Sequence, residues 1–385
     1  MVKRAVLGLG VLMAAAACEP QNNAAPPAEP EAAAAPFVDV TAPYETPFAD
    51  ERVSGAAFWA DPALSFRSVI AAIYERQALV LFDTELSPLD QRGGAWGGGL
   101  ALAYGLDGGE ALLAAHDDET GAFRFFTVDA EDRVLVDLNA DIKAKGPMRD
   151  ICLSSGDGGA FALHAVTQRG TYYAFDLETE AGNVASRDFA EFDNETPFTA
   201  CAVDNDAKRL YLGQADGRLL KADLAATEFV LELVDAKGPE TISGLALLAQ
   251  GDGAGRILAA NGDSGYIHVF DKNDYAFEGA FRVIDAFDVD AVDEITALSA
   301  FGGNLGGIYR NGVIAVGDGR DDQGANLKLV PWSAVANALG VDVGAAVSPR
   351  GQAAIEETDD DGVNIQLDGV PAEIMGEAQS GGENE

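Results

Sequence analysis

Positive charge is the scarcest feature of this 385-residue sequence, and its scarcity excludes some functions at once. There are 25 Lys and Arg residues against 63 Asp and Glu residues, which gives a formal net charge of -38 at pH 7. Nucleic acid and anionic lipid are polyanions, so a chain this acidic is a poor partner for either. Two interpretations of the charge remain: a solvated acidic surface, as in a salt-adapted organism, or carboxylates that bind cations.

Histidine and long apolar runs are also scarce. The three histidines, His116, His164 and His268, are far apart and have no neighbouring His, so no zinc site is predicted. Apart from the N-terminus, no apolar run is long enough to span a bilayer. Helical periodicity is rare, and residues 333–340 are the main candidate for a helix. The remaining pattern favours a mainly β protein.

The N-terminus, MVKRAVLGLGVLMAAAAC, has the features of a secretory signal. Two basic residues precede a short apolar run, and small residues lead to Cys18. The Ala-Ala-Ala-Cys ending resembles a bacterial lipoprotein signal, which implies that Cys18 is diacylated and becomes the mature N-terminus. Because Glu19 rather than Asp follows, we expect the outer membrane. The alternative is ordinary cleavage after an A-x-A site.

Composition divides the chain into four parts. Residues 1–18 are the predicted signal, and residues 19–50 are rich in Ala and Pro and read as a disordered tether. Residues 51–350 are long enough for one large β domain. Residues 351–385 are acidic and also read as disordered.

A short strand pattern recurs six times in the central domain. The copies are QALVLFD, FRFFTVD, GTYYAFD, GRLLKAD, GYIHVFD and ANLKLVP, which begin at Gln77, Phe123, Gly170, Gly217, Gly265 and Ala325. Successive starts are therefore 46, 47, 47, 48 and 60 residues apart. Such a period is typical of propeller blades.

A second series of strands, rich in small residues, precedes the first. Its members occupy residues 56–62, 98–104, 150–156, 199–205, 242–248 and 294–300. Small side chains suit the crowded innermost strand of a blade, and further strands lie between the two series. Six units of three to four strands predict an all-β, six-bladed β-propeller. The alternative is an array of β-sandwiches, which would not explain two interleaved series.

Two cysteines besides Cys18 lie in the small-residue series. Cys152 and Cys201 are 49 residues apart (201 − 152), about one period, so they occupy nearly the same place in successive units. Inner strands of neighbouring blades approach closely, and the expected compartment is oxidising. We therefore predict a disulfide between them; the alternative is two buried thiols.

Several longer segments resemble β-propeller phytases. The segments are DNDAKRLYLGQADGRLLKADL, ISGLALLAQGDGAGRILAANGDSGYIHVFDKND, FEGAFRV and NLKLVPW. Their order and spacing agree with the fourth to sixth blades of that family, and the likeness extends more loosely back to Phe58. The resemblance implies a calcium-dependent 3-phytase, which hydrolyses phosphomonoesters of phytate at one end of the channel. Calcium ions would bind the substrate phosphates and activate a water molecule.

Most of the carboxylates that the resemblance leads one to expect are missing. Other residues stand at those places: Ser54, Gly55, Ala200, Gln214, Ala215, Ser243 and Thr296. Each calcium ion wants six to eight oxygens, so the loss predicts weakened or absent phytase activity. The alternative function is a non-catalytic ligand- or protein-binding propeller at the cell surface.

Some candidate site residues remain. The acidic loop before the last blade and one later aspartate are candidate calcium ligands: Asp288, Asp290, Asp293, Glu294 and Asp318. Arg149 and Arg169 fall where the resemblance places a phosphate clamp. The alternatives are a solvated acidic loop and isolated salt-bridge partners. We expect a monomer that binds a phosphorylated small molecule and contacts the membrane only through its lipid.

Two weaker calcium candidates complete the list. Asp263 follows a turn and is a turn residue first. An acidic stretch from Glu357 to Asp368 mimics the spacing of a helix–loop–helix calcium loop, but no helices flank it.

Overall fold

The computed structural model describes residues 35–350 except 107–108, 157–158, 235–237, 263, 287 and 320–323. Within these residues the protein is mainly β-strand, as the sequence predicts. The one α-helix described is α1 (Trp332–Leu339), and short 3₁₀ turns occupy Ser65–Arg67, Gly251–Gly253 and Gly307–Tyr309. No helix in the described part of the chain is long and apolar enough to cross a membrane.

The strands follow one another in six antiparallel groups, listed here in chain order. The first two groups are β3 (Val53–Trp59), β4 (Val69–Tyr74), β5 (Ala78–Phe82) and β6 (Pro88–Gly93), then β7 (Trp96–Tyr104), β8 (Ala111–Asp117), β9 (Ala122–Asp129) and β10 (Val134–Lys143). The next two are β11 (Met148–Ser155), β12 (Phe161–Thr167), β13 (Tyr172–Glu180) and β14 (Asn183–Phe192), then β15 (Phe198–Asp204), β16 (Arg209–Gln214), β17 (Leu219–Asp223) and β18 (Glu232–Leu233). The last two are β19 (Gly244–Ala249), β20 (Gly255–Asn261), β21 (Tyr266–Asp271) and β22 (Phe277–Val283), then β23 (Ile295–Phe301), β24 (Val313–Asp318) and β25 (Asn326–Pro331).

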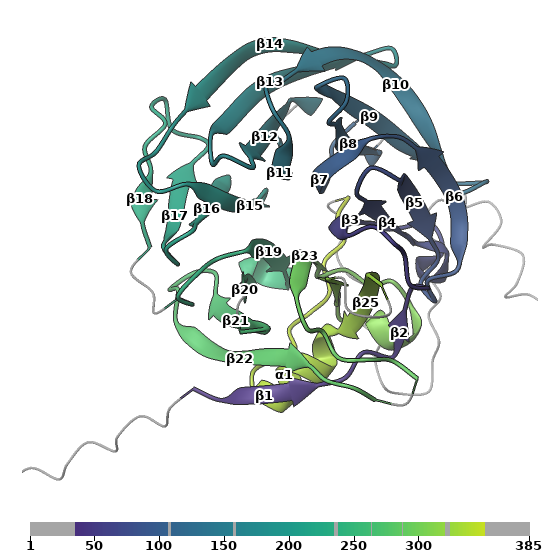
Figure 1. Cartoon of the computed structure of the whole chain (residues 1–385), viewed down its shortest axis with the longest axis vertical. Coiled ribbons are helices and arrows are strands. Elements are labelled where there is room, and N and C mark those ends of the chain that lie inside the picture. The colour runs from purple at the N-terminus through teal and green to yellow at the C-terminus, as the bar shows by residue number, and fades with distance from the viewer. Residues whose placement is uncertain are drawn as a thin grey trace, which may run out of the picture. The chain divides into compact units, whose positions relative to one another are not determined.

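The first strands of the six groups form a closed ring. Each contacts the next in the order β3, β7, β11, β15, β19, β23, and β23 contacts β3 again. Figure 1 shows these strands nearest the centre and the later strands of each group farther out. Neighbouring first strands run in the same direction: Asp150 contacts Cys201 near their beginnings, and Ser155 contacts Asn205 near their ends. The ring therefore has a start face, where all six first strands begin, and an end face, where they finish.

Hydrophobic clusters fill the space between adjacent groups. The cluster between β7–β10 and β11–β14, for example, includes the fully buried Phe123, Phe125 and Leu163. Strands with two buried faces carry near-continuous apolar runs, as in Ala78–Phe82, where every residue is buried. The second and third groups are also joined at their outer edges, where β10 pairs in parallel with β14 through Asn139 and Asn183.

Two N-terminal strands complete the last two groups. β2 (Tyr44–Glu45) pairs antiparallel with β25, and β1 (Phe37–Val40) pairs parallel with β22. The prediction of a disordered tether over residues 19–50 is therefore wrong for residues 37–45. The physical reason is that the last group has only three strands of its own, so β25 leaves an open edge whose N–H and C=O groups need partners. Composition averaged over 32 residues (19–50) hides the alternating Phe37–Val40 segment.

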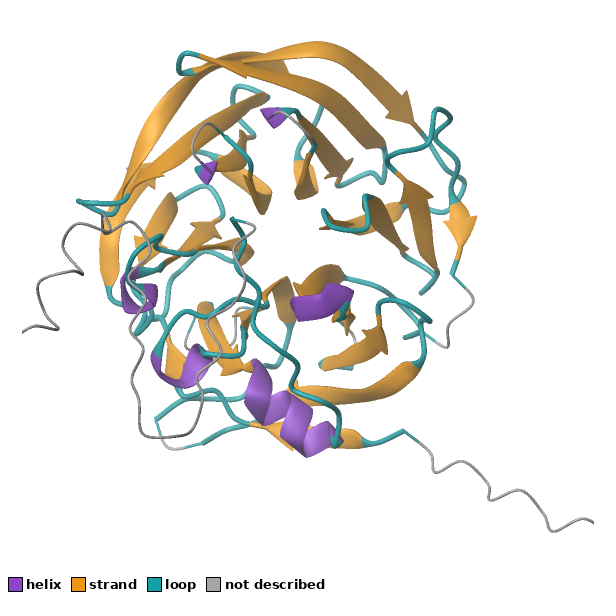
Figure 2. Cartoon of the chain, turned by 180° about the vertical axis from the view of Figure 1, so that it is seen from behind, coloured by secondary structure: helices purple, strands orange, loops and turns teal. Residues whose placement is uncertain are grey.

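The two strand series predicted from sequence are confirmed. The six copies of the first pattern become β5, β9, β13, β17, β21 and β25, and the small-residue series becomes the ring of first strands. The predicted helix at 333–340 is α1, one residue earlier, and ends where Gly340 adopts a left-handed conformation (φ 74°). Figure 2 shows α1 beside β1, which it contacts together with β22.

Candidate functional site

The start face is where the expected catalytic carboxylates would lie. Ser54 and Gly55 are at the beginning of β3, and Ala200 is near the beginning of β15. Ser54 is buried and its hydroxyl donates a long hydrogen bond (3.4 Å) to the carbonyl of Gly97. Ala200 is fully buried. None of the three offers an ionised oxygen to a metal.

Gly55 could not carry an acidic side chain without movement of the neighbouring strand. A Cβ atom built on Gly55 would lie 2.7 Å from the backbone carbon of Gly99 and 2.7 Å from the backbone nitrogen of Leu100. Real Cβ atoms do not approach backbone this closely, and the strand β7 has no flexible side chain there to yield. The close contact between β3 and β7 therefore depends on glycine, and the missing carboxylate is built into the backbone packing.

The other substituted positions at this face serve the fold. Gln214 is fully buried, and its amide donates to the carbonyl of Thr196 over 3.1 Å. The Ser243 hydroxyl donates to the carbonyl of Ala260 over 3.3 Å. Asp216 keeps a carboxylate, but it is exposed and pairs with Arg218 at 2.8 Å. These side chains hold local strand ends together and do not converge on one point.

Arg149 lies at the start face beside another arginine. Burial lowers the pKa of Arg149, and the positive charge of Arg52 lowers it further, while Asp150 partly opposes both effects. Arg52 also faces Glu294 at 4.0 Å. Within the described residues the guanidinium of Arg149 makes no hydrogen bond or ion pair. Two guanidinium groups that repel each other would be stabilised by an anion between them.

Arg169 is exposed in the turn between β12 and β13. The preceding residue, Gln168, donates its backbone N–H to the carbonyl of Pro147, which ties this turn to the beginning of β11. The structure therefore places Arg169 on the same face as Arg149. Its side chain, too, has no ion pair with any described residue.

Two of the predicted calcium ligands, Asp290 and Asp318, meet around a lysine. The fully buried Nζ of Lys328 lies 2.5 Å from Asp290 and donates to Asp318 over 2.9 Å. It also donates to the amide oxygen of Asn326 over 2.7 Å and lies 3.5 Å from Glu45. We call these five residues the Lys328 cluster. Neither Lys328 nor Glu45 was singled out from the sequence, although Lys328 lies inside the distinctive NLKLVPW segment.

The Lys328 cluster has the electrostatics of a buried ion network. Burial alone would lower the pKa of Lys328, but its bonds to Asp290 and Asp318 raise it above the usual value. Burial would raise the pKa of Asp290, yet the bond from Lys328 holds it below its usual range. For Asp318 burial prevails over Lys328 and the pKa is raised. Burial and the neighbouring Asp290 likewise raise the pKa of Glu45. The ammonium thus stands where a metal would have to stand.

The remaining acidic-loop residues point elsewhere. Asp288, Asp293 and Glu294 are exposed. The backbone N–H groups of Asp293 and Glu294 donate to one oxygen of Asp318, at 3.0 and 3.3 Å, so the loop is fastened by its backbone. The structure therefore does not bring the five predicted ligands together.

Calcium in the family's manner does not fit these residues. Calcium needs six to eight oxygen ligands. In the part of the chain that the structure describes, one group of three or more His, Cys, Asp or Glu side chains has ligand atoms within 4.8 Å of one another: Asp150, Cys152 and Cys201. Its two sulfurs are bonded to each other, so this group is not a calcium site either.

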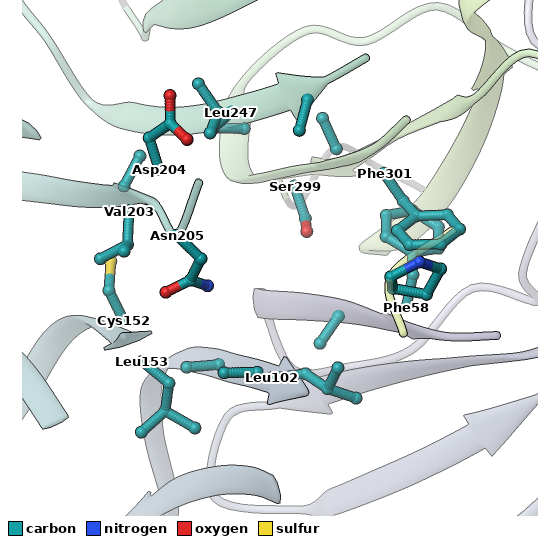
Figure 3. A pocket seen from close by; sticks show the side chains of 18 of the residues that line it. Phe58, Leu102, Cys152, Leu153, Val203, Asp204, Asn205, Leu247, Ser299 and Phe301 are labelled. Atoms are coloured by element: carbon teal, nitrogen blue, oxygen red, sulfur yellow. The ribbon is translucent and has the colours of Figure 1, made fainter. Parts of the chain in front are cut away.

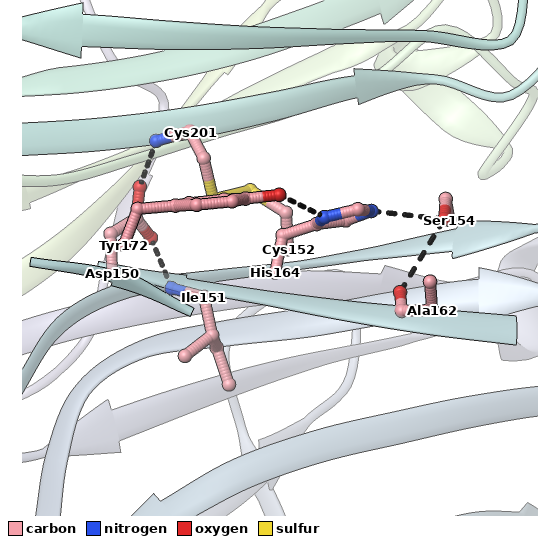
Figure 4. The surroundings of a disulfide bond; sticks show 8 residues. All are labelled: Asp150, Ile151, Cys152, Ser154, Ala162, His164, Tyr172 and Cys201. Atoms are coloured by element: carbon pink, nitrogen blue, oxygen red, sulfur yellow. Dashed lines mark hydrogen bonds between the residues drawn. A yellow bond between two sulfur atoms is a disulfide. The ribbon is translucent and has the colours of Figure 1, made fainter. Parts of the chain in front are cut away.

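Cys152 and Cys201 form a disulfide, in agreement with the predicted pairing. Their Cα atoms are 6.1 Å apart, and the bond joins β11 to β15. Figure 4 shows Asp150 next to it, with one oxygen accepting the N–H of Cys201 (2.8 Å) and the other that of Ile151 (2.9 Å). Burial raises the pKa of Asp150 to about 7. The first strands of the third and fourth groups are thus joined by a covalent bond and a hydrogen bond.

A Ser–His–Tyr arrangement lies behind the disulfide. The Ser154 hydroxyl is 3.0 Å from Nε2 of His164, and the Tyr172 hydroxyl is 2.8 Å from Nδ1 (Figure 4). Burial lowers the pKa of His164 to about 4, so the ring is neutral near pH 7. All three side chains are buried, and both ring nitrogens already have partners. This arrangement is a core network, since no substrate could reach it.

Three sequence predictions fall outside the described residues. They are the lipidated Cys18, the turn residue Asp263 and the acidic stretch from Glu357 to Asp368.

Comparison with known proteins gives one strong result. A family model described as Phytase matches residues 49–353. No curated protein matches the chain. Among solved structures, similar chains come from crystal structures of BBS1N in complex with ARL6DN. The crystal soaked with mercury gives 13% identity, 69% coverage of this chain, 76% of the other and a TM-score of 0.42. The crystal soaked with lead gives 10%, 71%, 77% and 0.42. Because the family match spans most of the 385 residues, the chain belongs to the phytase family.

Proposed function

We propose that this chain is a six-bladed β-propeller of the phytase type that binds a phosphorylated small molecule but hydrolyses it weakly or not at all. The six strand groups correspond to the six blades, with β2 supplying the fourth strand of the last blade. The closed ring of first strands supports this assignment. The phytase family is calcium-dependent, and its chemistry relies on carboxylates that gather metal ions near the substrate.

The packing at Gly55 carries the proposal. A missing carboxylate could be a simple substitution, but here a side chain at this position would overlap the backbone of β7. Ala200 is buried and cannot ligate, and Asp290 and Asp318 are held by Lys328. The face that would gather calcium therefore lacks ligands at β3 and β15, and in the last blade it holds an ammonium.

The arginines on the start face support binding without rapid turnover. Arg52 and Arg149 are close enough to affect each other's charge, and Arg149 has no counterion among the described residues. A phosphate between them would relieve this repulsion through charge-assisted hydrogen bonds. The net charge of -38 opposes binding of a polyanion, so the affinity should be modest and strongly dependent on salt.

A phosphate-release assay on phytate tests the loss of hydrolysis. With calcium added, we expect turnover well below a kcat of roughly 1 per second, the low end of ordinary enzymes. A family phytase that retains the paired first-blade aspartates is the positive control. Calcium-dependent release at or above that rate would refute the proposal.

Calorimetric titration of phytate in the presence of a chelator tests binding separately. We expect Arg149→Gln to weaken binding several-fold. Arg124→Gln is the matched control, because Arg124 is an arginine of similar exposure on β9 that pairs with Asp137. Equal affinities of the two variants, or no phytate binding at all, would remove the start face as an anion site.

We further propose that the protein is anchored in the bacterial outer membrane through Cys18. The Ala-Ala-Ala-Cys ending of the N-terminal signal supports this location. Cys18→Ser should release the protein from the membrane fraction or leave the signal uncleaved. Unchanged fractionation would contradict the anchor.

A further inference from the structure

A cavity of about 400 Å³ opens toward the end face of the ring. Its walls are the second halves of the six first strands, whereas the start face is formed by the beginnings of the same strands. The cavity is therefore separate from the arginines and substituted positions discussed above. Its volume is within the range of small-molecule sites.

The walls of this cavity are largely apolar. The main contributors are Phe58, Leu102, Leu153, Leu247, Leu298 and Phe301. Figure 3 shows Phe58 and Phe301 together on one side, where their rings stack with centroids 6.1 Å apart. Leu102, Leu247 and Leu298 are only partly buried, so they present apolar surface to the cavity. Water in such a space finds few hydrogen-bond partners, and an apolar molecule that displaces it gains free energy.

A few polar groups lie at one side of the cavity. Asn205 accepts the N–H of Ser155 over 2.7 Å, and its amide N–H groups have no acceptor among the described residues. The hydroxyl of Ser299 also points into the cavity (Figure 3). These groups can fix the orientation of a ligand that carries a hydrogen-bonding group on an apolar body.

The charges around the cavity disfavour an anion. Lys208 donates to the carbonyl of Ser155 over 3.0 Å, and Asp204 is neutralised by Lys272 at 2.8 Å. Asp206, by contrast, is exposed at the rim and its carboxylate pairs with no described cation. With a formal net charge of -38 behind it, this rim repels anions and accepts neutral or cationic groups.

A short C-terminal segment forms part of the cavity wall. Val347 donates its N–H to the carbonyl of Gly302 over 3.0 Å, and Val347–Pro349 line the cavity. The guanidinium of Arg350 lies over the rings of Tyr104 and Trp59, 4.9 and 5.7 Å from their centroids. These cation–π contacts hold the segment against the ends of β3 and β7. The cavity is thus enclosed by more than the ring itself.

We propose that this cavity is a binding site for a small, uncharged or cationic molecule with an apolar body and a hydrogen-bonding group. The apolar body lies among the leucines and between the ring and the Val347–Pro349 segment. The polar group meets Asn205 and Ser299. This ligand class differs from the polyanion expected at the start face, so the two sites do not compete.

A matched pair of fluorescent probes tests both the site and its charge preference. N-phenyl-1-naphthylamine is uncharged, and 1-anilinonaphthalene-8-sulfonate has the same aromatic body with a sulfonate added. We expect saturable 1:1 binding of the uncharged probe and at least tenfold weaker binding of the sulfonate. Phytate should not displace the uncharged probe. No saturable binding, equal affinity for the two probes, or displacement by phytate would overturn the proposal.

Two substitutions locate the probe. Leu247→Gln should weaken binding at least tenfold, because an apolar wall contact worth about 1.4 kcal/mol corresponds to that factor. Leu233→Gln is the control, since Leu233 is 59% exposed on β18 at the outer edge. Ser299→Leu, which fills the cavity without burying a polar group, should also weaken binding and serves if Leu247→Gln does not fold. Loss of binding in Leu233→Gln alone, or in neither cavity variant, would place the probe elsewhere.

Discussion

The ring holds its buried acids in two different ways. In the last strand group, Asp290 and Asp318 surround the ammonium of Lys328. Between the third and fourth groups, Asp150 has only backbone N–H donors, and burial raises its pKa to about 7. A cation lets a buried carboxylate stay charged, whereas two amide groups do not fully offset the loss of solvent. Acidic residues retained from a metal-binding family can therefore have a purely structural role.

The comparison also explains how the ring closes. Glu45 of β2 lies directly opposite Lys328 of β25 in the strand pairing. The N-terminal strand thus brings a carboxylate to a lysine near the other end of the domain, and charge adds to the backbone hydrogen bonds there. At the third and fourth groups the corresponding link is covalent.

Removing the lysine should have the largest effect. Lys328→Met leaves Asp290, Asp318 and Glu45 without their cation, and breaking a buried ion network in this way costs roughly 3–5 kcal/mol. Denaturant unfolding measures the loss. Lys221→Met is the control, because Lys221 pairs with the exposed Glu232 at 3.6 Å and should contribute about 1 kcal/mol or less.

A small loss in Lys328→Met would break the comparison. It would mean that the acids in the last group are satisfied by something other than lysine. Recovery of the lost stability on addition of calcium would show that these carboxylates can still act as metal ligands.

Removing the disulfide should have the next largest effect. Cys152→Ala together with Cys201→Ala should reduce the free energy of unfolding by roughly 3–4 kcal/mol, because the bond closes a loop of about 49 residues. Intact mass with and without reductant should differ by about two daltons in the natural protein. No mass difference would mean that the thiols are free and that Asp150 alone joins β11 to β15.

A single added methyl group tests the packing of the start face. Gly55→Ala should lower the free energy of unfolding by roughly 1–3 kcal/mol, as expected for an overpacked site. Gly93→Ala is the matched control, because a Cβ there would meet only the carbonyl oxygen of Gln77, at 4.0 Å. If both variants are equally stable, the strands can separate at Gly55, and the missing aspartate would reflect substitution alone.

The smallest effect concerns pH. Asp150 is raised to about 7 in the folded protein from an ordinary value of 3.8, so the folded state binds more protons between about pH 4 and 7. Its contribution therefore makes the folded state less stable as pH rises through this window. Asp150→Asn should remove that contribution and change stability at pH 7 relative to pH 4 by roughly 1 kcal/mol or more in favour of pH 7.

The pH experiment compares the variant with the natural protein because another group has the opposite sign. His164, with a pKa lowered to about 4, makes the folded state less stable as pH falls below its ordinary value of 6.5. This contribution is present in both proteins and cancels in the difference. Identical pH profiles would show that Asp150 is solvated.

The sequence by itself determined the strands, their sixfold repetition and the disulfide. Alternation in segments such as Gly265–Asp271 is local, and a repeat period places Cys152 and Cys201 at equivalent positions without knowledge of the fold. The absence of carboxylates at Ser54, Gly55 and Ala200 was also readable, because the family's order of segments fixes those positions.

Tertiary structure alone decided which charges meet and where the chain closes. Glu45 and Lys328 are 283 residues apart (328 − 45), and only the pairing of β2 with β25 brings them together. The contact between Gly55 and Gly99 and the end-face cavity arise in the same way, from strands of different groups packed around a ring. Local propensity determines a strand, but the neighbours of a side chain depend on long-range packing that no short stretch of sequence contains.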